Sequence, residues 1–157
     1  MALRQIRYET DELLRKTSRE VKEITPSIVT LIDDMIETME SREGVGLAAP
    51  QVGILRRIIT VDVEEGKNPI ALINPEILES SGTQTNSEAC LSLPKRSGKV
   101  IRPSKIKVKY TNRDGEETVL DAKDLLAVAI CHEVDHLNGI LYIDKVISMD
   151  DPADMED

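Results

Sequence analysis

Residues 125–136 read LLAVAICHEVDH, a nearly continuous apolar run that ends in two histidines four positions apart. The run predicts a buried helix over residues 124–138 that ends at an Asn-Gly cap. On such a helix His132 and His136 share one face, and burying two imidazoles is costly unless a metal or hydrogen bonds satisfy them. The HExxH spacing therefore indicates a divalent metal held by both histidines, with Glu133 as general base toward a metal-bound water.

The opposite interpretation of this motif is a pair of capped or surface histidines that bind no metal. The chain has only two histidines, and both lie in the motif, inside an apolar helix. We therefore favour the metal site.

A catalytic site with one metal needs a third protein ligand and one open position. The place where some peptidases carry a third histidine holds Tyr142 here, and Glu156 lies in an acidic tail without a helix to hold it. Upstream, Cys90 is the remaining soft ligand, whereas Cys131 points about 100° away from His132 around the helix. The expected ligands are Cys90, His132 and His136, with water in the fourth position. A thiolate ligand favours Fe2+, Zn2+ or Ni2+ over Mg2+ or Ca2+.

The composition of the 157-residue chain includes two cysteines, three tyrosines, and neither phenylalanine nor tryptophan. This length fits one domain with a core of Ile, Leu, Val and Met. Because two cysteines without CxxC spacing make no disulfide scaffold, we expect a reducing, cytoplasmic setting. The net charge of −9 argues against a specific nucleic-acid partner, and no apolar run approaches the roughly 18 residues of a membrane helix. We expect one catalytic domain over residues 1–147 and a disordered acidic tail over residues 148–157.

Turn residues and hydrophobic periodicity divide the rest of the chain into elements. Thr25-Pro26 is typical of the cap and first position of a helix, and the amphipathic pattern that follows ends near Arg42. Runs rich in β-branched residues predict strands over residues 57–63, 70–73, 105–110, 118–120 and 141–146. We expect an α+β fold with mostly antiparallel strands packed around the buried HExxH helix, and the helix of residues 26–42 against one side.

Residues 95–113 hold eight basic side chains and no acidic one. An RNA-binding surface is one interpretation. Lysine alternates strictly with apolar residues over residues 105–110, which favours the solvated outer face of a strand, or an edge strand guarded by lysine.

Three motifs in the chain resemble, in order and spacing, those of bacterial peptide deformylases. They are GVGLAAPQ at residues 44–51, EACLS at residues 88–92 and HEVDH at residues 132–136. The one departure is Ala89, where glycine is usual. The resemblance implies a hydrolase that removes the N-formyl group from the N-terminal methionine of newly synthesised proteins, giving formate and a free amino terminus. It also implies Fe2+ as the native cofactor, with Zn2+, Ni2+ or Co2+ able to occupy the site.

The resemblance also implies roles for single residues of these motifs. The side-chain amide of Gln51 and the backbone N–H of Leu91 would stabilise the tetrahedral oxyanion. Val45 and Gly46 would pair with the main chain of the substrate.

The methionine side chain of such a substrate requires an apolar pocket. The candidates are Val45, Leu125, Val128 and Ala129, of which the last three share a helix face before the first histidine. Glu88 and Arg102 match an ion pair of the family that braces the strand carrying Cys90.

N-formylmethionyl nascent peptides are the partners that the resemblance implies. Many relatives continue into a C-terminal helix after the last motif, whereas this chain ends soon after it. We therefore expect at most a transient contact with the ribosome.

Two rival hypotheses remain open at this point. A metallopeptidase of the HExxH type would cleave internal peptide bonds and use a ligand other than Cys90. A non-catalytic metal-binding or partner module would be expected to lack Glu133 or Gln51, and both are present.

Overall fold

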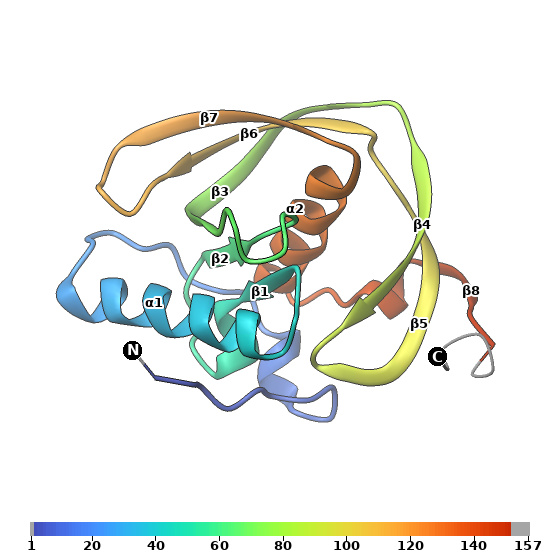
Figure 1. Cartoon of the computed structure of the whole chain (residues 1–157), viewed down its shortest axis with the longest axis horizontal. Coiled ribbons are helices and arrows are strands. Elements are labelled where there is room, and N and C mark those ends of the chain that lie inside the picture. Colours follow the sequence, from blue (N-terminus) through green and yellow to red (C-terminus); the bar gives the residue numbers. More distant parts are fainter. Residues whose placement is uncertain (1, 152–157) are drawn as a thin grey trace.

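The HExxH helix, α2 (Asp124–Leu137), lies at the centre of the fold, with one antiparallel sheet on each of two sides (Figure 1). The computed structural model describes residues 2–151. Nearly every residue of α2 from Ala127 onward is buried, as its apolar sequence predicts. Among the described residues α2 contacts strands of both sheets and so connects them.

The larger sheet has five strands in the order β1-β2-β3-β6-β7, and every neighbouring pair is antiparallel. Its strands are β1 (Gly46–Ala48), β2 (Ile58–Val61), β3 (Ile70–Ser81), β6 (Lys105–Thr111) and β7 (Glu117–Lys123). The smaller sheet has the order β4-β5-β8 and is also antiparallel. Its strands are β4 (Gln84–Cys90), β5 (Leu93–Arg102) and β8 (Val146–Met149). The expected α+β class with antiparallel strands around the HExxH helix is therefore confirmed.

The amphipathic helix α1 (Pro26–Ser41) begins where the sequence predicts, because Thr25 accepts a hydrogen bond from the backbone N–H of Ile28 at 3.3 Å. Its apolar face, with Ile32 and Met35 fully buried, packs in a core cluster that also contains residues of β1, β2 and β3. Helix α1 thus covers the larger sheet on the side away from α2.

The prediction of a strand over residues 141–146 is wrong. A 3-10 helix, η3 (Tyr142–Asp144), stands there, because the Asp144 carboxylate accepts the Leu141 backbone N–H at 3.0 Å and closes a turn. The strand comes later, as β8, and includes Ser148 and Met149, which the sequence analysis placed in the acidic tail. Residues 152–157 of that tail lie outside the described residues.

Strand β3 extends well beyond the predicted residues 70–73, through Pro75 and on to Ser81. Its register with β6 shifts between Ile73 and Glu76. A β-bulge at this point accommodates a proline, which lacks the N–H that a regular ladder requires. Pro75, which indicated the end of the strand in the sequence, therefore marks a β-bulge within a longer strand.

The lysines of residues 105–110 lie on an exposed face of β6, between β3 and β7. Lys107 pairs with Glu79 at 3.4 Å, and Lys109 pairs with Glu117 at 3.4 Å. The prediction of a solvated strand face is confirmed, whereas the alternative of an edge strand is wrong. These lysines face carboxylates from the neighbouring strands.

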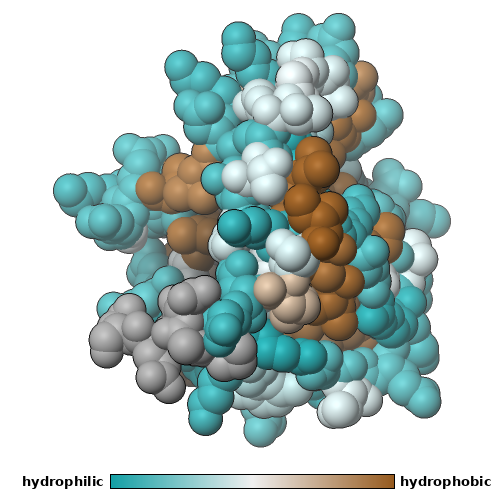
Figure 2. All heavy atoms as spheres, turned by 90° about the vertical axis from the view of Figure 1, so that its right-hand side faces the viewer, coloured by the Kyte–Doolittle hydropathy of each residue, from teal (hydrophilic) through white to brown (hydrophobic). Residues whose placement is uncertain are grey.

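The surface over the smaller sheet is of mixed polarity. Figure 2 shows a band of apolar side chains among hydrophilic ones on this face of the molecule. Ile101 of β5 and Ile147 and Met149 of β8 are each about half exposed. Within residues 2–151, no helix is long and apolar enough to cross a membrane.

The chain before α1 is tied to that helix by a buried carboxylate, Asp34. It accepts hydrogen bonds from the backbone N–H of Ala2 at 2.7 Å and from the Arg4 side chain at 2.8 Å. Burial by itself would raise the pKa of Asp34, but these two donors outweigh it and place the pKa below its usual value of 3.8. The ionised carboxylate therefore stabilises the docked N-terminal segment.

We predict that Asp34→Asn destabilises the protein by about 1–3 kcal/mol near neutral pH, because a charge-assisted pair is lost. A depressed pKa stabilises the folded state above the usual carboxyl pKa, and that stabilisation is lost as the pH falls through the lower, folded-state pKa. The difference from the unmutated chain should therefore shrink below pH 3.8. Urea unfolding across this range measures it, with Asp114→Asn at an exposed turn as control. A difference independent of pH would contradict the role assigned to Asp34.

Candidate metal centre and active site

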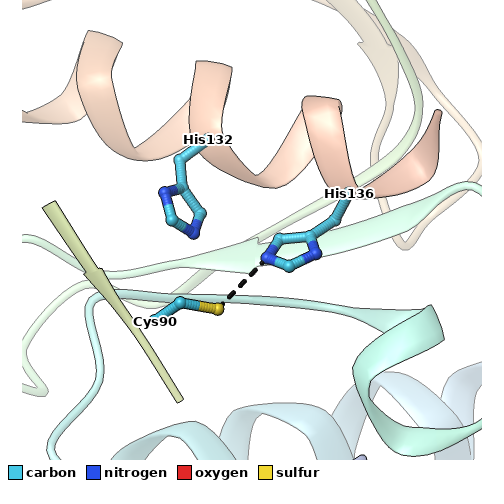
Figure 3. A group of neighbouring side chains, drawn as sticks. All are labelled: Cys90, His132 and His136. Carbon is cyan, nitrogen blue, oxygen red and sulfur yellow. Dashed lines mark hydrogen bonds between the residues drawn. The ribbon is translucent and has the colours of Figure 1, made fainter. Parts of the chain in front are cut away.

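Three side chains predicted as metal ligands meet beside α2. The ligand atoms of Cys90, His132 and His136 lie within 4.8 Å of one another. Cys90 Sγ is 3.3 Å from His136 Nε2, and both imidazoles project from one face of the helix toward the thiol (Figure 3). Cys90 is the last residue of β4, so the smaller sheet contributes the sulfur and α2 both nitrogens.

His132 is oriented by a carboxylate behind it. Its Nδ1 lies 2.8 Å from Oε1 of Glu88, so an Nδ1–H donated to Glu88 leaves Nε2 directed at the cluster. Arg102 donates two hydrogen bonds to Glu88, at 2.8 and 2.9 Å. Burial would raise the pKa of Glu88, but Arg102 and His132 lower it to about 2. Glu88 is thus an ionised, buried anion, and the ion pair expected for the family is present.

The buried network continues past Arg102 to the surface. Arg102 also donates to Asp135 of α2 at 2.7 Å, and Lys145 lies 3.0 Å from the same Asp135 oxygen.

The ring of Tyr142 stacks on His132 with centroids 6.0 Å apart and planes inclined by 22°. His132 is therefore restrained both at Nδ1 and on one ring face.

The charges around the cluster suit a cation. Burial lowers the pKa of His136 well below 6.5, which leaves the neutral imidazole that binds metals. Burial also opposes a charge on His132, yet Glu133, Cys90 and Glu88 raise its pKa to about 10. The anionic groups that would hold a proton here would stabilise a metal cation in the same place. A thiol sulfur and two imidazole nitrogens form a donor set that matches a first-row transition metal.

Glu133 faces the same space as the three ligands. It is 4 % exposed, and its Oε2 lies 4.0 Å from His132 Nε2. Its Oε1 has no hydrogen-bond partner among residues 2–151, and burial raises its pKa to about 7. A Cβ at Gly46 would lie 2.5 Å from Oε2 of Glu133, so β1 passes next to this carboxylate only because residue 46 is glycine.

Gln51 of the 3-10 helix η2 (Ala49–Val52) holds its side-chain amide in a defined direction. Its Oε1 accepts the Ala48 backbone N–H at 2.9 Å, and its Nε2 donates to Ser92 Oγ at 3.0 Å. The same Nε2 is 3.4 Å from Cys90 Sγ. The amide nitrogen of Gln51 therefore points toward the candidate ligand Cys90, as its predicted role requires.

A cleft of about 490 Å³ opens over the cluster and brings the predicted substrate residues together. Its lining includes Val45, Gly46, Gln51, Cys90, Leu91, Leu125, Val128, Ala129, His132 and Glu133. Val45 and Leu125 are about half exposed at the rim, whereas Val128 and Ala129 are almost fully buried. Of the predicted residues only His136 is absent from this lining, and it lies directly behind, against Cys90.

Some residues of the cleft were not predicted from the sequence. Tyr8, Arg42 and Lys95 line it from three segments far apart in the chain, and no spacing pattern connects them. Ser92 is not part of this lining but accepts the Gln51 amide; as the last residue of the EACLS motif it carried a sequence signal, although it was not predicted as a site residue. Ala89, the departure from the family pattern, also lines the cleft, and its φ is not in the left-handed region, so the methyl group strains no backbone.

Cys131 takes no part in this site. It is buried in the core between α2 and the larger sheet, where burial raises its pKa to about 11. The expectation that it is not a ligand agrees with this position.

The antiparallel fold, the Cys-His-His group and the buried Glu133 define a metal-dependent hydrolase. The family model for polypeptide deformylase matches residues 3–151. The chain is 59 % identical over 146 residues to peptide deformylase 1 of Clostridium acetobutylicum, which covers 93 % of this chain and 96 % of that protein. It is 50 % identical over 156 residues to peptide deformylase of Thermoanaerobacter pseudethanolicus, covering 99 % of this chain and 97 % of that one.

Solved structures agree with the sequence comparison. The crystal structure of peptide deformylase from Thermotoga maritima superposes with a TM-score of 0.89 at 43 % identity, covering 92 % of this chain and 97 % of that one. The chain belongs to the peptide deformylase family, whose members remove the N-formyl group from nascent peptides.

We predict that Glu88→Gln lowers the affinity for a divalent metal about 10- to 100-fold, because the anion that orients His132 becomes a neutral amide. Chelator competition with Zn2+ measures this affinity. Glu79→Gln, which removes an exposed partner of Lys107, is the matched control and should leave the affinity unchanged. Equal affinity of Glu88→Gln and the unmutated chain would show that Glu88 does not support the ligand.

Variants of the two cysteines should differ in how much metal they retain. We predict that Cys90→Ser reduces the metal content after dialysis, because a thiolate is replaced by a weakly coordinating hydroxyl. Cys131→Ser should keep the metal and lose only stability, since a hydroxyl enters an apolar core. Metal loss from Cys131→Ser at a temperature where it stays folded would refute this assignment of ligands.

Proposed function

We propose that Cys90, His132 and His136 hold one divalent metal, with Fe2+ as the native ion and Zn2+, Ni2+ or Co2+ as possible replacements. The convergence of one sulfur and two imidazole nitrogens within 4.8 Å is the observation that carries this proposal. When bound there, the metal supplies a Lewis acid that acidifies water and polarises a carbonyl oxygen. The rest of the chemistry belongs to side chains and backbone groups of the chain.

Glu133 is the proton carrier of the proposed mechanism. Its buried carboxylate lies next to the ligands, and its Oε1 has no competing partner among the described residues. It takes the proton of the attacking water as the water oxygen adds to the formyl carbon. It then delivers a proton to the nitrogen of the peptide amine as the carbon–nitrogen bond breaks. Formate and a free amino terminus result.

Gln51 and Leu91 are the proposed donors to the tetrahedral oxyanion. The contact from Ala48 holds the oxygen of the Gln51 side chain, so its NH2 group is directed at the cluster before substrate arrives. Leu91 follows the ligand Cys90 directly in the chain and lines the cleft, so its backbone N–H is the second proposed donor. Loss of one such donor typically raises the barrier by about 2.7–4 kcal/mol.

Substrate binding is proposed along β1, whose pairing leaves one side free. In the larger sheet β1 pairs only with β2 among the described strands, so its other edge is open. Gly46 and the preceding Val45 are the proposed contacts there with the main chain of a peptide. The methionine side chain would enter between rim and floor of the cleft. Its proposed contacts are Val45, Leu125, Val128 and Ala129.

We further propose that the protein works in the cytoplasm, where nascent formylated chains appear, and that the catalytic domain predicted over residues 1–147 extends to the end of β8 at Met149. The presence of two unpaired cysteines among the described residues supports a reducing compartment. A transient contact with the ribosome stays a prediction from the sequence.

The test of this function is anaerobic preparation with Fe2+ followed by an assay of formate released from a formyl-methionyl peptide. We expect formate from the Fe2+ form. A metal-loaded protein that releases none would overturn the proposal, and cleavage of an internal peptide bond instead would favour a metallopeptidase.

We predict that Glu133→Ala keeps its metal and loses about 10²- to 10⁴-fold in kcat, because the proton carrier is removed while the ligands remain. Metal content and formate release are measured on the same sample. Glu79→Ala, at an exposed site on β3, is the control. If Glu133→Ala lost the metal, its carboxylate would be a ligand and not the base.

A further inference from the structure

The segment before η1 (Glu12–Arg15), which we call the N-terminal strap (residues 6–11), contributes Tyr8 to the lining of the cleft. The backbone N–H of Arg7 donates to the carbonyl oxygen of Gln51 at 2.7 Å, and that of Glu9 donates to the carbonyl oxygen of Ser92 at 3.0 Å. In Figure 1 the dark blue segment runs below α1 and reaches the turn between β4 and β5. The strap is therefore hydrogen-bonded through its backbone to two separate segments of the chain, at Gln51 and at Ser92.

These two segments belong to different sheets. Gln51 follows β1 of the larger sheet, and Ser92 lies between β4 and β5 of the smaller one. No strand of one sheet pairs with a strand of the other among the described residues. The hydrogen bond from Gln51 Nε2 to Ser92 Oγ at 3.0 Å joins the segments through side chains, and the strap joins them through the backbone.

The strap and the 3-10 helix η1 that follows it are anchored in two separate core clusters. Ile6, 3 % exposed, packs in the cluster of α1, β1 and η2, whereas Leu14, 1 % exposed, packs with Leu93 beneath the smaller sheet. Between them the Asp11 backbone N–H donates to the Tyr8 carbonyl at 2.8 Å and closes a turn. The strap thus lies between two buried anchors, Ile6 and Leu14.

Further contacts hold the strap against both walls. Glu9 forms an ion pair with Arg96 near the tip of the β4–β5 hairpin. At the other wall the Arg7 guanidinium lies so close to Gly53 that a Cβ there would be 2.9 Å from it. Tyr8, between these contacts, is 44 % exposed and lines the cleft.

We propose that the N-terminal strap sets the separation of the two oxyanion donors, and that the backbone amides of Arg7 and Glu9 are its positioning groups. The inference rests on the proposed roles of Gln51 and Leu91. The strap bonds to Gln51 itself and to Ser92, the residue after Leu91. An error of about 1 Å in the placement of such donors is enough to lower a rate about 100-fold.

The test removes each positioning N–H by substituting proline, which has none. We expect Arg7→Pro and Glu9→Pro to lower kcat for a formyl-methionyl peptide about 10- to 100-fold with KM and metal content nearly unchanged. Glu12→Pro is the matched control, because residue 12 is the first position of η1, where a proline is tolerated. It should retain the kcat of the unmutated chain.

A second comparison separates positioning from general loosening. If the strap acts through the oxyanion donors, Glu9→Pro should lower kcat much less in a Gln51→Ala background than in the unmutated chain. If the factors by which Glu9→Pro and Gln51→Ala each lower kcat simply multiply in the double variant, the proposal is overturned. It is also overturned by proline variants that keep both metal and full kcat, or by variants whose loss of kcat follows their loss of metal.

Milder variants decide the matter if the proline variants do not fold. Glu9→Ala and Arg96→Ala each remove the ion pair that holds the backbone of Glu9 beside Ser92, and we expect each to lower kcat about two- to fivefold, with the double variant no worse than either single one. Unchanged kcat in both would overturn the proposal. Failure of the unmutated Fe2+ protein to release formate would instead refute the proposed function, so the two failures are distinguishable.

Discussion

The buried carboxylate of Glu88 is the interaction on which the site depends. It lies on β4, accepts two hydrogen bonds from Arg102 on β5, and holds His132 on α2 by its Nδ1. Removing two charges from water is costly, and breaking one partner of such a pair typically destabilises a protein by about 3–5 kcal/mol. This buried ion pair fixes the orientation of the smaller sheet relative to the central helix, so that a thiol and two imidazoles meet.

A cleft formed between two sheets requires connections that neither sheet supplies. Helix α2 contacts both sheets, and the Gln51–Ser92 hydrogen bond links their facing segments. Because β1 is an edge strand and β4 ends at Cys90, the free side of one sheet faces the metal group held partly by the other. In the proposed function, a peptide would lie along β1 as an added strand, with its formyl group at the three candidate ligands. A Cβ at Gly46 would lie 2.5 Å from Oε2 of Glu133, so a side chain there would displace that carboxylate.

Local patterns predicted the elements that local physics forms. The Thr25-Pro26 start of α1 and the apolar run of α2 are visible in the sequence because capping and helical periodicity act over a few residues. The prediction of a strand over residues 141–146 was wrong because the Asp144 side chain closes a turn there. The predicted length of β3 was too short because β3 continues to pair with β6 beyond Pro75. Both outcomes depend on contacts that periodicity does not register.

The candidate site divides in the same way. The sequence by itself predicted the three candidate ligands and Glu133 as base, because a chain with two histidines and two cysteines offers few ways to build a three-ligand site around HExxH. It also determined the family through three ordered motifs. Only the tertiary structure decided that Tyr142 stacks on His132, that Ser92 receives the Gln51 amide, and that residues 6–11 bridge the cleft walls. Those contacts join segments far apart in the chain, so they exist only after the two sheets have packed against α2.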